Sequence, residues 1–249
     1  MSGTALRSLD IRATEAWRDV AVQIPLRGGV LRARLDVPRG DIRLSQLAPV
    51  ARQLSRLIVQ QAQGLARGCG ASIPCRKGCA ACCRYLVPLS PPEAFRLWDD
   101  LQTLPPDRQR TILRRFDAAA RRLLDAAPCP QAEALPALSR WYRSLDVTCP
   151  LLEDECCALY SRRPLACREF LVNGAPTECS SDSTDSAQLP LPVSPALALA
   201  RLAAELEGED DHAILLPLAP AWAMNHPERR RQTWPAGELV DRLLTVMQG

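Results

Sequence analysis

The sequence of 249 residues predicts a mainly α-helical fold with a small β-hairpin, in which an irregular cysteine-rich metal knot is embedded in a helical domain. Three observations lead to this prediction. Apolar residues recur with a period of about 3.6 along several segments, and they alternate along one segment near the N-terminus. Cysteines are crowded at short spacings in the middle of the chain. Because 47% of the residues are apolar, the chain can also form a real hydrophobic core.

The hairpin is predicted over residues 20–38. Apolar residues alternate with polar ones on both sides of a glycine-containing turn at residues 27–29. The polar partners Arg32, Arg34 and Asp36 would then face water, because successive strand residues point to opposite sides of a sheet.

The helical period first appears over residues 45–67, where glycines on either side of Cys69 end the pattern. Ser90-Pro-Pro-Glu93 is typical of a capping box at the start of a second helix. This second helix is predicted at residues 90–101. Further helices are predicted at residues 105–126, 131–145, 194–207 and 236–247. A polar loop over residues 173–190 indicates a boundary. The predicted division is an N-terminal arm with the hairpin at 1–44, a cysteine-cluster metal-binding domain at 45–182 and a C-terminal helical extension at 183–249.

Charge and hydropathy limit the partners. The net charge is +3, and the positive side is almost wholly arginine, with Lys77 as the single lysine. These arginines alternate with acidic residues along the chain, so we expect no nucleic-acid partner. The N-terminus lacks a signal peptide and no run approaches the roughly 18 apolar residues of a membrane span, so we expect a cytoplasmic protein without a membrane partner.

The cysteines carry the chemistry. The chain has eleven of them, and one stretch runs Cys75-Arg-Lys-Gly-Cys79-Ala-Ala-Cys82-Cys83. In a reducing compartment such a density favours metal binding over a disulfide framework, and the odd count argues against complete pairing. As a helix this stretch would present its thiols within an arc of about 100°. As a loop, the same spacings suit a knuckle that wraps an ion.

A second group of cysteines follows more than sixty residues later. Between Cys149 and Cys157, two short extended pieces are joined by an acidic turn at residues 153–155. A helical turn that begins near Pro164 then carries Cys167. We expect these cysteines to close the shell that the first group begins.

These motifs resemble the cysteine-cluster proteins of the YkgJ type, a family defined by the motif CxxCxxCC and described as a zinc- or iron-chelating domain. The resemblance covers about residues 70–180, and its specific parts are the Cys-Cys doublet, Cys149-Pro, Cys157-x-Leu-Tyr160 and Arg163-Pro-x-x-Cys167-Arg168-Glu169-Phe170. It implies metal ligands at Cys75, Cys79, Cys82, Cys83, Cys149, Cys157, Cys167 and Cys179. It leaves Cys69, Cys129 and Cys156 outside the pattern. Three residues separate Cys75 from Cys79, where the motif name has two.

The family is also distantly similar to the cysteine-rich part of flagellin lysine N-methylases. This likeness implies an iron–sulfur enzyme, either a protein lysine N-methyltransferase or a redox protein, as the alternative to a metal-binding module. The partners would be a metal ion or cluster and, for the enzyme, a protein substrate. The sequence has no recognisable S-adenosylmethionine loop, nucleotide-binding loop or nucleophile elbow, and it identifies no catalytic residue.

The eight thiolates could fill two four-cysteine zinc sites or hold one iron–sulfur cluster of the 4Fe–4S type with thiols to spare. The resemblance and the cysteine doublet favour iron–sulfur over zinc. His212 and His226 lie outside the cluster, and we expect surface or loop positions for both. Arg163 and Arg168 have two interpretations: they bind the cofactor or its substrate, or they form ion pairs with the acidic turn at residues 153–155.

Overall fold

The computed structural model describes residues 16–26, 29–126, 135–175, 179, 188–208 and 213–248. The predicted fold class is confirmed: the described chain is mainly helical, with a β-hairpin and other small two-stranded sheets. The helices are α2 (Leu44–Gly68), α3 (Pro91–Gln102), α4 (Pro106–Asp125), α5 (Leu135–Ser144), α6 (Leu165–Glu169), α8 (Pro195–Glu207), α9 (Ala219–Asn225), α10 (Pro227–Arg231) and α11 (Ala236–Val246), with 3-10 turns η1 (Tyr160–Arg162) and η3 (Leu216–Leu218). The strands are β1 (Trp17–Leu26), β2 (Gly29–Pro38), β3 (Asp41–Arg43), β4 (Pro88–Leu89), β5 (Leu152–Glu153), β6 (Cys156–Cys157), β7 (Ile214–Leu215) and β8 (Thr233–Pro235).

The hairpin forms as the alternation predicts. β1 pairs antiparallel with β2, and Ile24 lies opposite Leu31 in the register. Ile24 and Leu35 are fully buried, whereas Arg32, Arg34 and Asp36 are exposed. Two residues of the predicted turn, 27 and 28, lie outside the described part of the chain.

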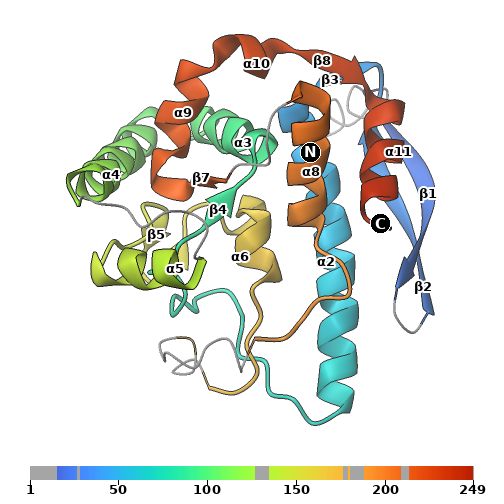
Figure 1. Ribbon diagram of the computed structural model, residues 1–249, viewed down its shortest axis with the longest axis horizontal. Coiled ribbons are helices and arrows are strands. Elements are labelled where there is room, and N and C mark those ends of the chain that lie inside the picture. The colour runs from blue at the N-terminus through green and yellow to red at the C-terminus, as the bar shows by residue number, and fades with distance from the viewer. Residues whose placement is uncertain are drawn as a thin grey trace, which may run out of the picture.

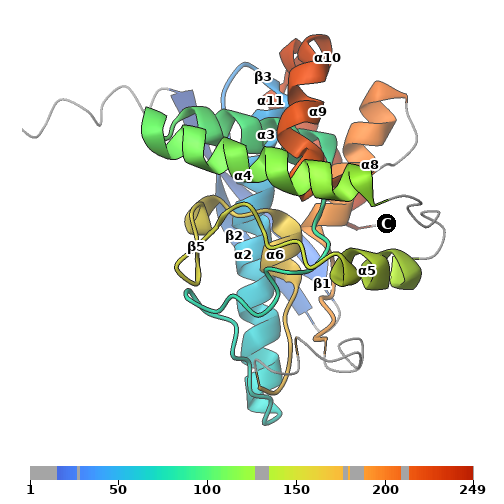
Figure 2. The same cartoon turned by 90° about the vertical axis from the view of Figure 1, so that its left-hand side faces the viewer.

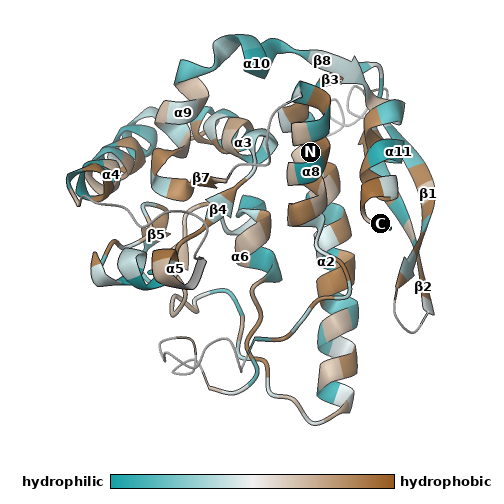
Figure 3. Ribbon diagram, viewed as in Figure 1, coloured by the Kyte–Doolittle hydropathy of each residue, from teal (hydrophilic) through white to brown (hydrophobic). Residues whose placement is uncertain are grey.

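A first hydrophobic core surrounds the long helix α2. The apolar face of α2, which includes Leu47, Leu54 and Ile58, packs against α8, α11 and the hairpin. Figure 1 shows α8, α11 and the two hairpin strands beside α2, and Figure 3 shows apolar and hydrophilic residues alternating along these helices. β3 pairs with β8, so the C-terminal part of the chain is also fastened to the start of α2.

A second core lies on the other side of α2. It joins α3 and α4 to the short strands and the η3 turn through residues such as Leu97, Ile112, Phe116 and Leu216. Several cysteines of the predicted metal knot pack against this core: Cys149, Cys157 and Cys167. Figure 2 shows α4 at the front of this half of the molecule, with β5 and α6 beneath it. The cysteine-rich segment therefore packs against the second apolar core.

The helices predicted from the apolar period at residues 45–67, 90–101, 105–126, 194–207 and 236–247 are confirmed, with ends that differ by one or two residues. α5 covers the second part of its predicted range, while residues 131–134 lie outside the described chain. α10 and the pairing of β3 with β8 were not predicted, because such short elements carry too little pattern. None of the helices in the described ranges combines the length and the apolar character that crossing a bilayer requires.

The buried carboxylate of Glu93 connects the starts of two helices, α3 and α6. The Ser90 backbone N–H and hydroxyl donate to Glu93 Oε2 over 3.4 and 3.1 Å, which forms the predicted capping box. The Leu165 backbone N–H donates to Oε1 over 2.8 Å. Burial raises the pKa of Glu93, and these hydrogen bonds and the nearby Arg52 oppose the shift. Glu93 thus links the start of α3 to the start of α6.

We predict that Glu93→Ala lowers the free energy of unfolding by about 2 to 4 kcal/mol, because it removes the capping box and leaves the buried Leu165 N–H without an acceptor. Urea denaturation measures the change. The matched control is Glu228→Ala, since the Glu228 side chain is 84% exposed and pairs only at the surface with Arg231. A loss below about 0.5 kcal/mol is expected for the control, and equal losses in the two variants would contradict the role given to Glu93.

Candidate metal centre

The first cysteine cluster is a loop, so the loop interpretation is correct and the helical one is wrong. No helix is present among the described residues 71–90. Tight turns shape the segment: the Cys79 N–H donates to the Arg76 carbonyl over 3.1 Å, and the Cys83 N–H donates to the Ala80 carbonyl over 2.9 Å. Gly78 takes a φ of +86°, a left-handed conformation that a helix excludes and glycine allows.

The second cluster has the predicted form. β5 pairs antiparallel with β6, which places Leu152 opposite Cys157. Asp154 and Glu155 form the turn with φ values of +46° and +56°. These left-handed residues reverse the chain within two positions, so Cys157 returns toward Cys149.

Direct contacts join the two clusters. The Cys149 N–H donates to the Cys83 carbonyl over 2.8 Å. Phe170, directly after α6, meets Tyr85 edge to face, with ring centroids 5.9 Å apart. Segments that are far apart in the sequence therefore meet at the cysteine loop.

The thiols lie close enough to influence one another. Burial, with a smaller effect from the neighbouring Cys157 and Cys82, raises the pKa of Cys149 to about 12. Burial also raises the pKa of Cys167 well above its ordinary value, with added effects from Cys149, Cys82 and Cys157. For Cys75, burial raises the pKa, and Cys82 and Cys79 act in the same direction. The thiols linked in this way are those of Cys75, Cys79, Cys82, Cys83, Cys149, Cys156, Cys157 and Cys167.

The adjacent pair Cys82 and Cys83 differs from the rest. The Cys83 thiol donates a hydrogen bond to the Cys82 sulfur, and this lowers the pKa of Cys82 to about 7 and raises that of Cys83. The charge of Arg163 is a smaller contribution to the lowered pKa of Cys82. Cys82 is thus the thiol that loses its proton most readily among those whose pKa is shifted, and a thiolate is the form that binds metal.

The remaining cysteines differ in burial. Cys179 is buried, between two ranges that are not described, and Cys69 is exposed at the end of α2. Cys156 is half-buried in β6, and Cys129 lies outside the described residues. The nine described cysteines other than Cys179 are free thiols.

The two histidines were expected at surface or loop positions. His226 lies in the turn between α9 and α10, where its Nδ1 is 2.7 Å from the Trp222 carbonyl oxygen and its ring stacks on the Trp222 indole. His212 lies outside the described residues.

Within the described ranges, no three His, Cys, Asp or Glu side chains converge closely enough to hold a metal ion as they stand. Two other observations fit a thiolate-bound centre. The donors are soft sulfurs, which suit zinc and iron–sulfur clusters. Buried polar atoms near them, Arg163 Nε and Tyr85 Oη, have no hydrogen-bond partner in the described chain.

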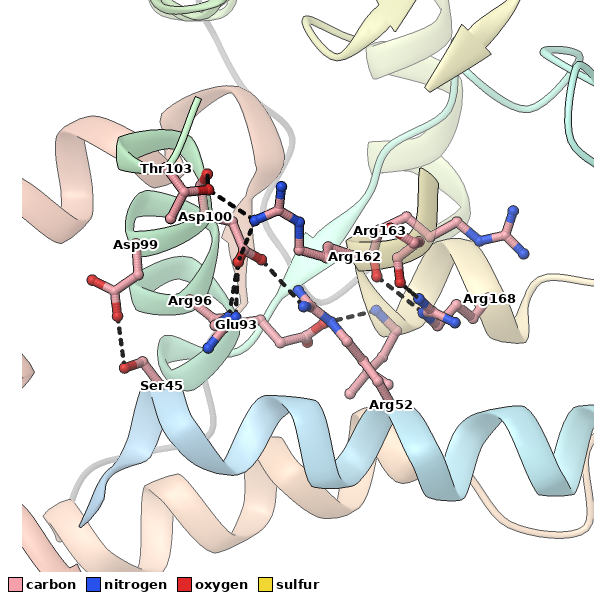
Figure 4. Close-up of polar contacts among 12 residues, drawn as sticks. Ser45, Arg52, Glu93, Arg96, Asp99, Asp100, Thr103, Arg162, Arg163 and Arg168 are labelled. Atoms are coloured by element: carbon pink, nitrogen blue, oxygen red, sulfur yellow. Dashed lines mark hydrogen bonds and ion pairs between the residues drawn. The ribbon is translucent and has the colours of Figure 1, made fainter. Parts of the chain in front are cut away.

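Arg168 and Arg163 act differently from each other. Arg168 donates from Nε to the Arg163 carbonyl over 3.1 Å and from Nη2 to the Ser161 carbonyl, so it braces the turn before α6 (Figure 4). Burial, with the charges of Arg163 and Arg52, lowers the pKa of Arg168 to about 10. The Arg163 guanidinium lies over the Tyr160 ring, 4.4 Å from its centroid.

One of the two interpretations of Arg163 and Arg168 was an ion pair with the acidic turn at residues 153–155. For Glu153 this prediction is wrong. Glu153 pairs instead with two arginines of α4, with Arg108 at 2.7 Å and Arg115 at 3.3 Å. The physical reason is that β5 lies under α4, so the acidic turn faces the basic side of that helix (Figure 2).

A buried carboxylate that the sequence analysis missed holds the cysteine segment to the helices. Asp100 is 1% exposed and pairs with Arg52 of α2 at 3.2 Å, Arg96 of α3 at 2.9 Å and Arg162 of η1 at 3.3 Å (Figure 4). An available signal was its position, because Asp100 interrupts the apolar face that Leu97 and Leu101 define.

Glu169, which was singled out only as part of the motif, makes a similar connection. Its carboxylate accepts hydrogen bonds from the Ser194 hydroxyl at 2.5 Å and the Ala196 N–H at 3.1 Å, at the start of α8. Burial raises the pKa of Glu169 to about 7. The short helix that carries Cys167 is therefore fastened to α8 as well as to α3.

The soft donors and the helical frame define a thiol-rich, cysteine-cluster domain. Residues 74–186 match the family described as "CxxCxxCC: Putative zinc- or iron-chelating domain". The match covers the cysteine segment and confirms the resemblance drawn from the cysteine motifs. No curated protein and no solved structure matches the chain.

We predict that Asp100→Asn lowers the free energy of unfolding by about 3 to 5 kcal/mol, because it leaves the buried Arg52 charge without its partner. Asp117→Asn is the control, since Asp117 pairs with Arg121 at the surface, where the two side chains are 62% and 74% exposed. The control should lose less than about 0.5 kcal/mol. Chemical denaturation of both variants measures the difference, and a similar small loss in each would refute the anchoring role of Asp100.

Proposed function

We propose that this protein binds a metal centre through its cysteine thiolates and that the centre is an iron–sulfur cluster rather than zinc. The ligands are drawn from Cys75, Cys79, Cys82, Cys83, Cys149, Cys157, Cys167 and Cys179. The observation that carries the proposal is the mutual influence of the thiols at seven of these positions, which come from separate parts of the chain.

The energetic argument is one of charge. A group of thiolates in a half-buried place repels itself, and burial already keeps Cys149 and Cys167 protonated. A bound metal cation replaces those protons and removes the repulsion. Bringing the sulfurs together then becomes favourable, so metal binding adds to the folding free energy of this region.

The choice of an iron–sulfur cluster, of the 4Fe–4S type, depends on the donor set. All candidate ligands are sulfur, and they outnumber the four that one zinc ion takes. The His226 ring is engaged with Trp222, through Nδ1 and by stacking. Zinc on two four-cysteine sites is the alternative, and the family description names both metals.

The proposed role is metal binding in a cytoplasmic protein, where reducing conditions keep the thiols free. The distant likeness to flagellin lysine N-methylases supplies an alternative, in which the same cluster serves an enzyme that acts on a protein. The proposed metal site is common to both roles.

We expect protein purified without exposure to air to contain iron and acid-labile sulfide and to be brown. Elemental analysis and visible absorption test this directly. A colourless protein with stoichiometric zinc would replace the iron–sulfur assignment by the zinc one. Protein that retains neither metal, before or after anaerobic reconstitution with iron and sulfide or incubation with Zn²⁺, would contradict the proposed function.

We also expect Cys167→Ala to lose the metal and to unfold the region around α6, since bound metal contributes roughly 10 kcal/mol in thiolate sites. Cys69→Ala is the matched control, because Cys69 is exposed at the end of α2 and lies outside the family pattern. Metal content and thermal melting are measured for both. Full metal content in Cys167→Ala, or an equal loss in the control, would show that the ligand set is wrong.

A further inference from the structure

Three arginines lie close together in the sequence around η1 and α6, and they have different partners. Arg162 donates to Asp100 at 3.3 Å and to the Thr103 hydroxyl at 2.9 Å. Arg168 donates to two backbone carbonyls. Arg163, between them, has a buried Nε without a hydrogen-bond partner in the described chain. A buried donor without an acceptor is destabilising, so this atom indicates a missing acceptor.

The position of Arg163 is well defined. Its guanidinium lies over the Tyr160 ring at 4.4 Å, and its carbonyl accepts the hydrogen bond from Arg168 Nε at 3.1 Å. Pro164, the next residue, is the N-cap of α6 and restricts the backbone further. The side chain is therefore held in place before any metal binds, which is what an oriented donor requires.

The charge of Arg163 acts on thiols from separate segments. Burial raises the pKa of Cys75, Cys157 and Cys167, and the charge of Arg163 opposes that rise. The same charge contributes to the lowered pKa of Cys82. A divalent metal ion with four thiolates carries a net charge of about −2, and a cation beside such a centre offsets part of it.

We propose that Arg163 is the outer-shell partner of the metal centre, with its Nε–H donating to a metal-bound sulfur and its positive charge offsetting that of the thiolates. This inference rests on the proposed function, because it requires that the thiolates bind a metal. Arg163 is a positioning residue here, since it acts through the ligands. This role accounts for three observations together: the unsatisfied Nε, the stacking on Tyr160, and the effect of the Arg163 charge on several thiols.

The test compares the Zn²⁺ affinity of four proteins by competition with a chromophoric chelator under anaerobic conditions. Arg163→Gln removes the charge and should bind Zn²⁺ about 10- to 100-fold more weakly than the wild type, the usual effect of losing an outer-shell partner. Arg163→Lys keeps the charge and should recover most of the affinity. Arg84→Gln is the matched control, because Arg84 adjoins Cys83 but is exposed and paired with Asp146, and it should bind Zn²⁺ as the wild type does.

A second readout separates an outer-shell role from a packing role. With Co²⁺ as the probe, losing a hydrogen bond to a bound sulfur should move the sulfur-to-cobalt charge-transfer band of Arg163→Gln to lower energy. An unchanged affinity in Arg163→Gln would overturn the inference. So would a loss of affinity that Arg163→Lys does not restore and that leaves the Co²⁺ band unmoved. If the wild type binds neither ion and also takes up no iron and sulfide on anaerobic reconstitution, the proposed function fails instead, so the two failures are distinguishable.

Discussion

The repulsion among crowded thiolates is the constraint on which this structure depends. Eight cysteine thiols influence one another in one half-buried region, and burial together with their neighbours raises the pKa of most of them. Sulfur atoms arranged in this way are stable either as protonated thiols or as ligands of a cation. The arrangement of loops, turns and helices around them is best understood as a frame that holds them near each other despite that repulsion.

The frame is fixed by buried carboxylates rather than by long regular elements. Glu93 holds the start of α6, Asp100 holds η1 through Arg162, and Glu169 holds the start of α8. Each joins the cysteine segment to a helix that belongs to a large apolar core. A short helix such as α6 would not be stable alone, so these contacts decide where Cys167 lies. The cysteine segment and the helical body are therefore energetically coupled.

Much of the fold could be predicted from the sequence because its signals are local. The apolar period located α2, α3, α4, α8 and α11, and the Ser90–Glu93 capping box marked the start of α3. The acidic turn between β5 and β6 was also readable, since it is confined to a few residues. The spacing of the first cluster could not separate a helix from a loop, because both bring the thiols together. The left-handed Gly78 decides for the loop.

The contacts that hold the site were beyond sequence reasoning. Arg52 and Asp100 are 48 residues apart, and nothing in the local pattern of either residue indicates the other. Equally, the partner of Glu153 depended on the placement of α4, which the sequence did not provide. The eight-cysteine ligand set and the division into three domains stay predictions.

X-ray absorption at the metal edge of the protein purified without air tests the central claim most directly. The account predicts a first shell made of sulfur alone, at about 2.3 Å. A first shell that contains mainly nitrogen or oxygen would contradict it, because the thiolates would then not be the ligands.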